Sequence, residues 1–420
     1  MSFQQGLSGL NAAAKNLDVI GNNVANSGTV GFKQSQAQFA DVYANSLTGA
    51  GGANVGIGTK VAQVSQQFTQ GNITATNNPL DMAINGGGFF RMDNNGEATY
   101  QRNGQFQLDR MGFIVNPTGA KLTGYTANAS GVLSTGAPAP LSINTADLVP
   151  QITSEVNAVL NLDSGSTPID AATVPFDMND PTTFHSSTAV SVYDSLGNSQ
   201  TLQTFYVLRP PVAPATTGAW DVYAASDSVP IGYVPPAAPV TVASLSFSTS
   251  GILQTAMPLA PINVPATATG ATTPFPVTLD FTGTTQFGSA FSVNTLNQDG
   301  YTAGRLAGFN IGADGMILGR YTNGQSAVLG QVVLANFANP NGLQQLGNNM
   351  WAETSTSGNP LIGIPSSGSL GVLQSSAVED SNVDLTAELV NLITAQRVYQ
   401  ANAQTIKAQD AVMQTLVNLR

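Results

Sequence analysis

The sequence has no cysteine and a single histidine among its 420 residues. Without cysteine it forms no disulfide, thiolate metal site or cysteine nucleophile. The one histidine, His185, excludes metal sites that need two or three histidines and leaves a Ser-His-Asp triad only one possible base. No Gly-x-Ser-x-Gly motif accompanies it. We therefore expect no catalytic residue, no cofactor and no metal, and predict that the protein is not an enzyme.

Charged residues are also scarce. They make up 9% of the chain, against about 25% in an ordinary soluble domain. The net charge is −11, and between Lys121 and Arg397 the basic residues are Arg209, Arg305 and Arg320. A nucleic-acid groove needs clustered cations, so a nucleic-acid partner is not expected. A surface with few charges makes association between copies easier.

Long apolar runs are missing as well. None approaches the ~18–20 residues of a membrane-spanning helix, so no membrane span is expected. The first residues, Met1-Ser2-Phe3-Gln4-Gln5, lack the basic and apolar regions of a cleaved secretory signal. Composition alone therefore predicts a cytoplasmic protein.

What the sequence does contain begins with a heptad pattern at each end, which predicts helices over residues 2–24 and 381–420. The N-terminal seam consists of Phe3, Leu7, Leu10, Ala14, Leu17, Gly21 and Val24. The C-terminal seam consists of Leu385, Leu389, Leu392, Gln396, Tyr399, Ala403, Ile406, Asp410, Met413 and Val417. A narrow apolar stripe needs a partner, so we expect the helices to pair with each other or with other copies in a coiled-coil-like domain. The alternative is that each packs on the core of its own domain. Ser381 followed by Asp384 resembles a capping box at the start of the second helix.

Between the ends the pattern is that of strands and turns. Asn-Gly pairs, which favour hairpin turns, occur at Asn85-Gly86, Asn95-Gly96, Asn103-Gly104 and Asn323-Gly324. Residues 194–198 likewise predict a hairpin turn between two alternating Thr/Val-rich runs. The region from 146 to 299 holds most of the prolines and has an all-β pattern.

The predicted fold is multidomain and mainly β, with long terminal helices and nested, discontinuous domains. The expected order is a terminal helical domain (1–30 and 380–420), a connecting segment (31–70 and 365–379), a β domain (71–145 and 300–364) and an inserted outer β domain (146–299).

Three further groups of residues have simple structural interpretations. Gly86-Gly87-Gly88 is not followed by Gly-Lys-Ser/Thr and is interpreted as a turn. Glu379-Asp380 lies near the start of the second helix, where the helix dipole favours anions. Arg91, Arg102 and Arg110, which lie near Asp93, Glu97 and Asp109, are expected to form surface ion pairs.

The terminal motifs resemble those of the bacterial flagellar axial proteins, the rod and hook family. The N-terminal motifs are residues 8–14, 16–26 and the tripeptide Gly31-Phe32-Lys33; the C-terminal ones are residues 381–385, 395–400, 402–407 and 416–420. Internal motifs at residues 85–91, 102–106 and 329–337 resemble the hook members most. The resemblance covers residues 1–145 and 301–420, and the middle of the chain resembles the family only in layout.

This resemblance implies a structural subunit of the flagellar hook, a curved hollow helical tube that acts as a universal joint and transmits torque from rod to filament. It implies polymerisation with copies of itself, contacts with the distal rod protein, the hook cap and the hook–filament junction protein, and passage through the flagellar type III export apparatus. The protein is then expected outside the cell, exported without a cleaved signal, which replaces the cytoplasmic prediction. The terminal helices would line the inner tube.

Three alternatives remain open at this point. A distal rod or other flagellar axial component shares the terminal motifs. A secreted β-rich hydrolase lacks a base, a metal set and a nucleophile motif. A surface adhesin or stalk built on terminal coiled coils does not account for the motifs within the β regions.

Overall fold

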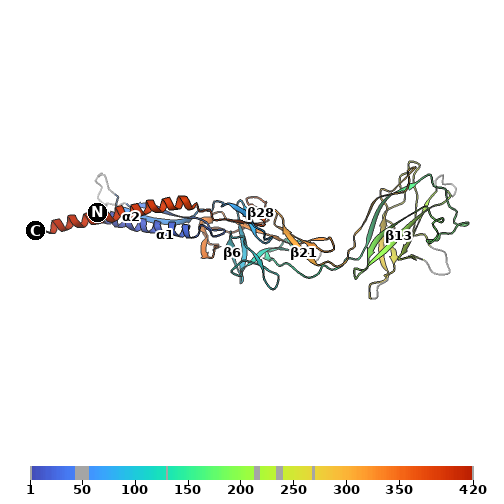
Figure 1. The fold of residues 1–420 in the computed structure, drawn as a ribbon, viewed down its shortest axis with the longest axis horizontal. Helices are drawn as coiled ribbons and strands as arrows, with labels where there is room; N and C mark the ends of the chain where they lie inside the picture. Colours follow the sequence, from blue (N-terminus) through green and yellow to red (C-terminus); the bar gives the residue numbers. More distant parts are fainter. Residues whose placement is uncertain are drawn as a thin grey trace. The chain divides into compact units, whose positions relative to one another are not determined.

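The computed structural model describes residues 2–42, 56–128, 131–211, 218–232, 240–266 and 270–418. In these residues the protein is mainly β, with a long helix at each end, which confirms the predicted composition of the fold (Figure 1). The chain divides into two compact units. Unit 1 comprises Met1–Thr145, Ala307–Arg320 and Ser326–Arg420, and unit 2 comprises Ala146–Leu306 and Tyr321–Gln325.

The terminal helices α1 (Ser2–Ala25) and α2 (Leu385–Asn418) lie side by side and antiparallel in unit 1 (Figure 1). Glycines allow their close approach: a Cβ added at Gly9 would lie 2.7 Å from Oδ1 of Asn402, and one at Gly6 would lie 3.1 Å from Ile406. Because α2 is 34 residues long and α1 is 24, the C-terminal turns of α2 extend past the start of α1.

The start of α2 differs from the sequence expectation. The backbone N–H groups of Thr386 and Ala387 donate to Oδ1 of Asp384 at 2.9 and 3.2 Å. Asp384 is therefore the N-cap, and the helix begins at Leu385 rather than near Ser381. The predicted capping box was wrong because the Ser381 hydroxyl accepts from the Val383 N–H, before the helix begins, and Asp384 alone caps its first turn.

A β-ribbon follows α1 and packs against it. It consists of β1 (Ser35–Val42) and β2 (Gly58–Gln66), which pair antiparallel. Asn23 fixes the ribbon to the helix, because its side chain accepts from the Ser35 N–H at 2.9 Å and donates to the Ser35 carbonyl at 2.8 Å. The glycine-rich part of the expected connecting segment lies at 49–52, outside the described residues.

A large branched sheet forms the centre of unit 1. Its longest path runs β21 (Leu306–Ile311), β22 (Met316–Tyr321), β23 (Ser326–Val332), β9 (Lys121–Thr126), β5 (Phe89–Asn94), β6 (Glu97–Gln101), β26 (Met350–Ala352) and β25 (Gln344–Gly347). Shorter strands join it at β7 (Gln107–Leu108), β8 (Ile114–Val115), β10 (Ala139–Pro140), β24 (Leu334–Asn336) and β27 (Leu361–Gly363). A 3₁₀ turn, η1, spans Pro340–Gly342.

Two short strand pairs bring the end of the β region back to its beginning. Strand β29 (Ala377–Glu379) pairs antiparallel with β3 (Ile73–Ala75). Strand β28 (Val372–Ser375) pairs antiparallel with β4 (Met82–Asn85). The segment that leads into α2 is thus held beside the segment that follows the β1–β2 ribbon.

The predicted turns have mixed outcomes. Asn95 and Gly96, with φ of 55° and 95°, close the β5–β6 hairpin as expected, and residues 194–198 close the hairpin between Tyr193 and Ser199. Asn85-Gly86 does not close a hairpin, because β4 pairs with β28 instead of β5. Asn103-Gly104 is not a turn of this kind either, since Gly104 lies against the Met82 backbone, where a Cβ would be 1.6 Å from the carbonyl oxygen.

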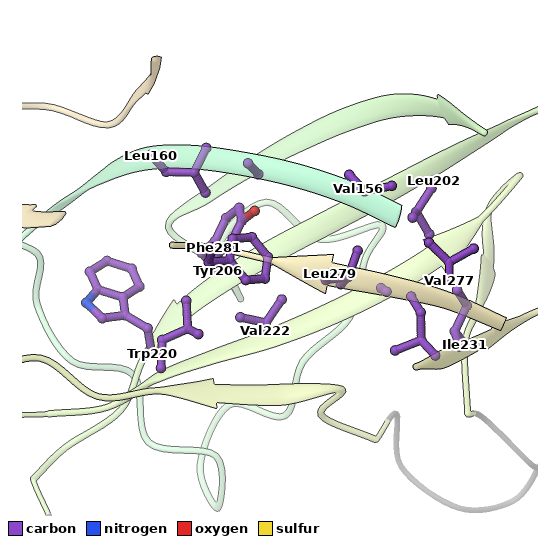
Figure 2. Packing of buried hydrophobic residues seen from close by; sticks show 14 of the residues in the cluster. Val156, Leu160, Leu202, Tyr206, Trp220, Val222, Ile231, Val277, Leu279 and Phe281 are labelled. Carbon is purple, nitrogen blue, oxygen red and sulfur yellow. The ribbon is translucent and has the colours of Figure 1, made fainter. Parts of the chain in front are cut away.

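Unit 2 contains two sheets that enclose an apolar core. One contains β17 (Ile262–Val264), β18 (Phe275–Asp280), β11 (Glu155–Asp163), β19 (Thr285–Phe287) and β20 (Ser292–Gln298). The other contains β12 (Ser186–Tyr193), β13 (Ser199–Leu208), β14 (Trp220–Ser226), β15 (Val229–Pro230) and β16 (Ala243–Leu245). Figure 2 shows side chains of both sheets meeting, including Leu160, Tyr206, Trp220 and Phe281. This core is the main source of stability expected for the unit.

Gly104→Ala should destabilise unit 1 by about 3 kcal/mol or more, because the new methyl group would overlap backbone that has no room to move. Gly308→Ala is the matched control, since nothing lies within 4 Å of its Cβ position, and should change stability by less than about 0.5 kcal/mol. Calorimetric unfolding of the monomer measures both. Equal effects of the two variants would show that the close approach at Gly104 is not present in solution.

Candidate functional site

Three deeply buried charges of unit 1 form one cluster, close to the end of α1 and the start of α2. Glu379 is 0% exposed, Lys33 1% and Arg102 4%. The Lys33 Nζ lies 2.6 Å from Oε1 of Glu379, and an Arg102 terminal nitrogen lies 3.2 Å from Oε2. Each carboxylate oxygen therefore has its own cation. We call these three residues the buried charge cluster.

The cluster also satisfies backbone groups from several segments. Oε1 of Glu379 accepts from the Gly71 N–H at 2.9 Å, and Lys33 donates to the Thr69 carbonyl at 2.7 Å. Arg102 donates to the Gly86 carbonyl at 2.7 Å. Buried ions are tolerated when most of their remaining hydrogen-bonding capacity is used in this way; in this cluster the Arg102 Nε atom has no partner among the described residues. The result is a polar joint between the segments that leave α1, flank β3 and β4, and enter α2.

Burial sets the protonation chemistry of the two cations. Loss of hydration lowers the pKa of Lys33; the Glu379 carboxylate opposes this shift and the neighbouring Arg102 charge adds to it. Burial also lowers the pKa of Arg102, again opposed by Glu379. With two cations and one anion, the cluster is a site at which an added positive charge is disfavoured.

These positions correct two expectations. Arg102 does not form a surface ion pair, and Glu379 does not serve the start of α2, which begins six residues later. Among the described residues Arg91 and Arg110 form no ion pair. Sequence reasoning missed the cluster because Lys33 and Glu379 are 346 residues apart. The sequence features that came closest to indicating this cluster were Lys33 and Arg102, which lie within the motifs that resemble the family.

The acidic residues that were expected to pair with these arginines stabilise turns or lie exposed. Asp93 accepts from the Gly96 N–H at 2.7 Å in the β5–β6 turn. Asp109 accepts from the N–H groups of Met111 and Phe113, both at 2.8 Å. They stabilise turns by accepting backbone hydrogen bonds, whereas Glu97 is exposed at the end of the hairpin.

A groove of about 690 Å³ lies between α1, α2 and the β1–β2 ribbon. Its apolar lining includes Ala13, Ile20, Phe39, Ala395 and Val398. Its acidic lining residue is Glu388, which is 3% exposed. Gln34 donates its side-chain N–H to Oε1 of Glu388, but Oε2 has no hydrogen-bond partner among the described residues. A buried carboxylate oxygen without a donor is costly and marks the groove as incomplete in the single chain.

The predicted helix seams lie largely outside the contact between α1 and α2. The face of α1 that the chain buries is made of small residues and Val19, Ile20 and Asn23, about a third of a turn from the predicted seam. The exposed seam residues are Phe3, Leu7, Gly21, Leu385, Leu389, Gln396, Tyr399, Asp410, Met413 and Val417. Those of intermediate exposure are Leu10, Ala14, Leu17, Val24, Leu392, Ala403 and Ile406. Within one chain, α1 and α2 therefore pack mainly through residues outside the predicted seams. Contacts between copies through the seams remain a prediction.

Within the described parts of the chain, no group of three or more His, Cys, Asp or Glu side chains is placed to hold a metal ion. In the same residues, neither helix is long and apolar enough to cross a membrane.

Comparison with protein families assigns both ends of the chain and residues 83–301 to one class. Residues 3–33 match the flagella basal body rod protein family, and residues 374–419 match the flagellar basal body rod FlgEFG protein C-terminal family. Residues 83–163 match the flagellar hook protein FlgE/F/G D1 domain, and residues 161–301 match the flagellar basal body protein FlaE D2 domain. The class is therefore that of the flagellar rod and hook proteins.

Relatives that match over their full length distinguish hook proteins from rod proteins within this class. The flagellar hook protein FlgE of Salmonella typhimurium is 43% identical over 424 residues, covering 100% of both chains. That of Escherichia coli is 41% identical with the same coverage. The crystal structure of Helicobacter pylori flagellar hook protein FlgE2 matches the fold with a TM-score of 0.55 at 14% identity, covering 73% of this chain and 100% of that one. The chain belongs to the flagellar hook protein FlgE family.

Glu379→Gln should destabilise unit 1 by about 3–5 kcal/mol, because it leaves two buried cations without an anion. Glu97→Gln makes the same chemical change at an exposed position and should cost less than about 0.5 kcal/mol. Thermal and urea unfolding of the monomer would measure the difference. If both variants unfolded like the parent, the cluster would contribute nothing to stability.

Lys33→Met should be less harmful than Glu379→Gln, because Arg102 and Glu379 remain paired one to one. It should also change the pH dependence. The folded-state pKa of Lys33 lies below the ordinary value of 10.5. Between these two pKa values the unfolded chain binds more protons than the folded chain, so the stability of the parent increases as the pH rises through this range. The Lys33→Met chain should lack this gain. Parallel slopes of unfolding free energy against pH for the two proteins would contradict it.

Proposed function

We propose that this chain is the structural subunit of a bacterial flagellar hook, and that it assembles through its terminal helices into a curved, hollow helical tube. Full-length similarity to hook proteins supports the hook assignment, and membership of this family argues for a structural role instead of catalysis. The observation that carries the assembly mechanism is the exposed apolar seam of the two helices. Phe3 is 51% exposed, Leu389 45% and Met413 60%.

Burial of that seam would drive polymerisation. Each large apolar side chain contributes roughly 1.5–3 kcal/mol when it passes from water to a packed interface. A helix with apolar residues on more than one face is typical of one that is surrounded by partners. In this proposal α1 and α2 pair through their small-residue faces within a subunit, and coiled-coil-like contacts through the seams join neighbouring subunits.

The order of domains in the tube follows from the same idea. Residues 1–30 and 380–420 would form the inner tube, 31–70 and 365–379 the connecting segment, 71–145 and 300–364 a β domain outside it, and 146–299 the outermost domain. The division of the described chain into two units, the second formed mainly by residues 146–306, supports an inserted domain.

Transmission of torque requires that the helical part and the β part of a subunit turn together. The buried charge cluster is suited to this task, because it joins the segments at both helix bases with short, geometrically specific contacts. Bending requires contacts that exchange easily, and an outer surface with few charges supplies them, since polar uncharged groups and water exchange partners at low net cost. Together these properties describe a universal joint.

Placement in the flagellum implies further partners. The tube would meet the distal rod protein at one end and, at the other, the hook cap during growth and the hook–filament junction protein afterwards. The chain would reach its place outside the cell through the flagellar type III export apparatus, without a cleaved signal. The absence of cysteine suits a chain that is exported unfolded, because no disulfide could trap it.

Leu7→Asp should abolish tube formation while leaving the monomer folded. Leu7 is 44% exposed in the single chain, so the change should alter monomer stability by less than about 0.5 kcal/mol, whereas a charge buried in the assembled seam is strongly disfavoured. Asn22→Asp places the same charge at an exposed position of α1 that is not three or four residues from any seam residue, so this variant should assemble. Electron microscopy and sedimentation of the purified proteins provide the readout. Curved tubes from the parent chain would support the hook assignment, and short straight tubes would indicate a rod component. Normal tubes from Leu7→Asp would contradict the proposed role of the seam in assembly.

A further inference from the structure

We propose that the groove beside Glu388 receives α2 of a second copy, and that Arg397 of that copy pairs with the open carboxylate oxygen of Glu388. This inference rests on the proposed function and names a specific contact within it. It concerns a surface different from the predicted seams. Three observations carry it: the incomplete bonding of Glu388, the apolar lining of the groove, and the composition of the outer face of α2.

The first observation is the carboxylate. Glu388 is 3% exposed, and its Oε2 lacks a partner among the described residues although Oε1 is held by Gln34. Its neighbours along the groove include Asn391, Thr394 and Asn402, and the residues that line the groove contribute no cation. A buried anion in such surroundings favours a cationic donor. Gln34 holds the carboxylate through Oε1, so an arginine that enters the groove and displaces the side chains that cover Oε2 would meet that oxygen in a fixed position.

The second observation is what the chain offers in return. On α2, Val390, Ile393 and Arg397 have spacings of three and four residues, so they share one face of the helix. All three are exposed, Val390 by 59% and Ile393 by 51%. Within the described residues Arg397 forms no ion pair. This face combines apolar side chains with one cation, which complements an apolar groove with one carboxylate.

Arginine is well suited to the pairing. Its planar guanidinium carries several donors, tolerates burial better than an ammonium group and can bind a carboxylate through two nitrogens. The aliphatic part of its side chain can lie along the apolar lining, which includes Ala395 and Val398. Val390 and Ile393 would then displace water from the groove.

The geometry of the contact is that of a helical polymer. Glu388 and Arg397 lie on different faces of the same helix, about 13 Å apart along its axis, so they cannot pair within one chain. A contact between two different surfaces of identical subunits is heterologous and produces an open helical array when it does not close into a ring. The groove and the outer face of α2 therefore provide a repeating contact of the kind that a tube requires.

The decisive test is a double-mutant cycle on tube assembly with the full-length chain. Critical concentrations would be measured for the parent, Arg397→Gln, Glu388→Gln and the double variant. Each single change should raise the critical concentration at least about tenfold, and the double change should add little more, because both remove the same pair. Lys407→Gln, which removes another exposed cation of α2, is the matched control and should assemble like the parent.

Monomer unfolding separates folding from assembly. Arg397 is exposed, so Arg397→Gln should leave the monomer transition unchanged, whereas Glu388→Gln alters a buried group and its critical concentration is compared at its own measured monomer stability. An Arg397→Gln chain with the parent's critical concentration would overturn the proposal, as would additive effects of the two changes. An effect of Glu388→Gln alone would show that the groove takes a solvent cation or water instead. If the parent chain forms no tube at all, the proposed function fails together with this contact.

A cross-linking experiment tests the same contact directly, since the natural chain contains no cysteine. Tubes of the Glu388→Cys, Arg397→Cys double variant should give a ladder of covalent oligomers on oxidation, and the dispersed monomer should give none. The separation of the two positions along α2 exceeds the reach of an intrachain disulfide. Glu388→Cys combined with Asn11→Cys is the control and should give no ladder. Tubes that form but do not cross-link would exclude the arrangement.

Discussion

The architecture of unit 1 depends on one buried carboxylate. Glu379 binds Lys33 and Arg102 with its two oxygens and also accepts the Gly71 N–H. Its own carbonyl accepts the Gly31 N–H at 2.7 Å. The segments that it joins come from opposite ends of the chain and from the β region between them. An apolar residue at this position could add burial energy but could not specify which three segments meet, because dispersion contacts have no direction.

Sparse charge elsewhere makes this cluster more significant. A protein with so few ionised side chains has few long-range forces that favour one packing over another. The buried charges of unit 1 include the cluster at the junction of helices and β region and Glu388 in the groove beside α2. The β surfaces instead use amide and hydroxyl groups, whose hydrogen bonds are individually modest and easily exchanged with water. Rigid and adaptable contacts are thus separated within one subunit.

Local patterns in the sequence predicted local structure well. The heptad run predicted a helix over 2–24, and α1 spans Ser2–Ala25; Asn95-Gly96 closes its hairpin because both residues adopt the positive φ that this turn requires. Contacts between segments that are distant in the sequence could not be predicted from local patterns. Nothing near Glu379 indicates Lys33, and β1 was missed because its alternating Gln and Ala residues carry little hydrophobic signal. The buried face of α1 was also missed, since close packing there uses glycine and alanine, which contribute little to an apolar pattern.

The return of β28 and β29 to β4 and β3 has a mechanical consequence. These two strand pairs and the Glu379 ion pairs tie the segment that leads into α2 to the segments that follow α1, all within unit 1. Unit 2 contributes no strand to either pair and no residue to these ion pairs. A change at either strand pair would therefore alter how α1 and α2 are held to the central sheet, whereas a change within unit 2 would leave these contacts in place.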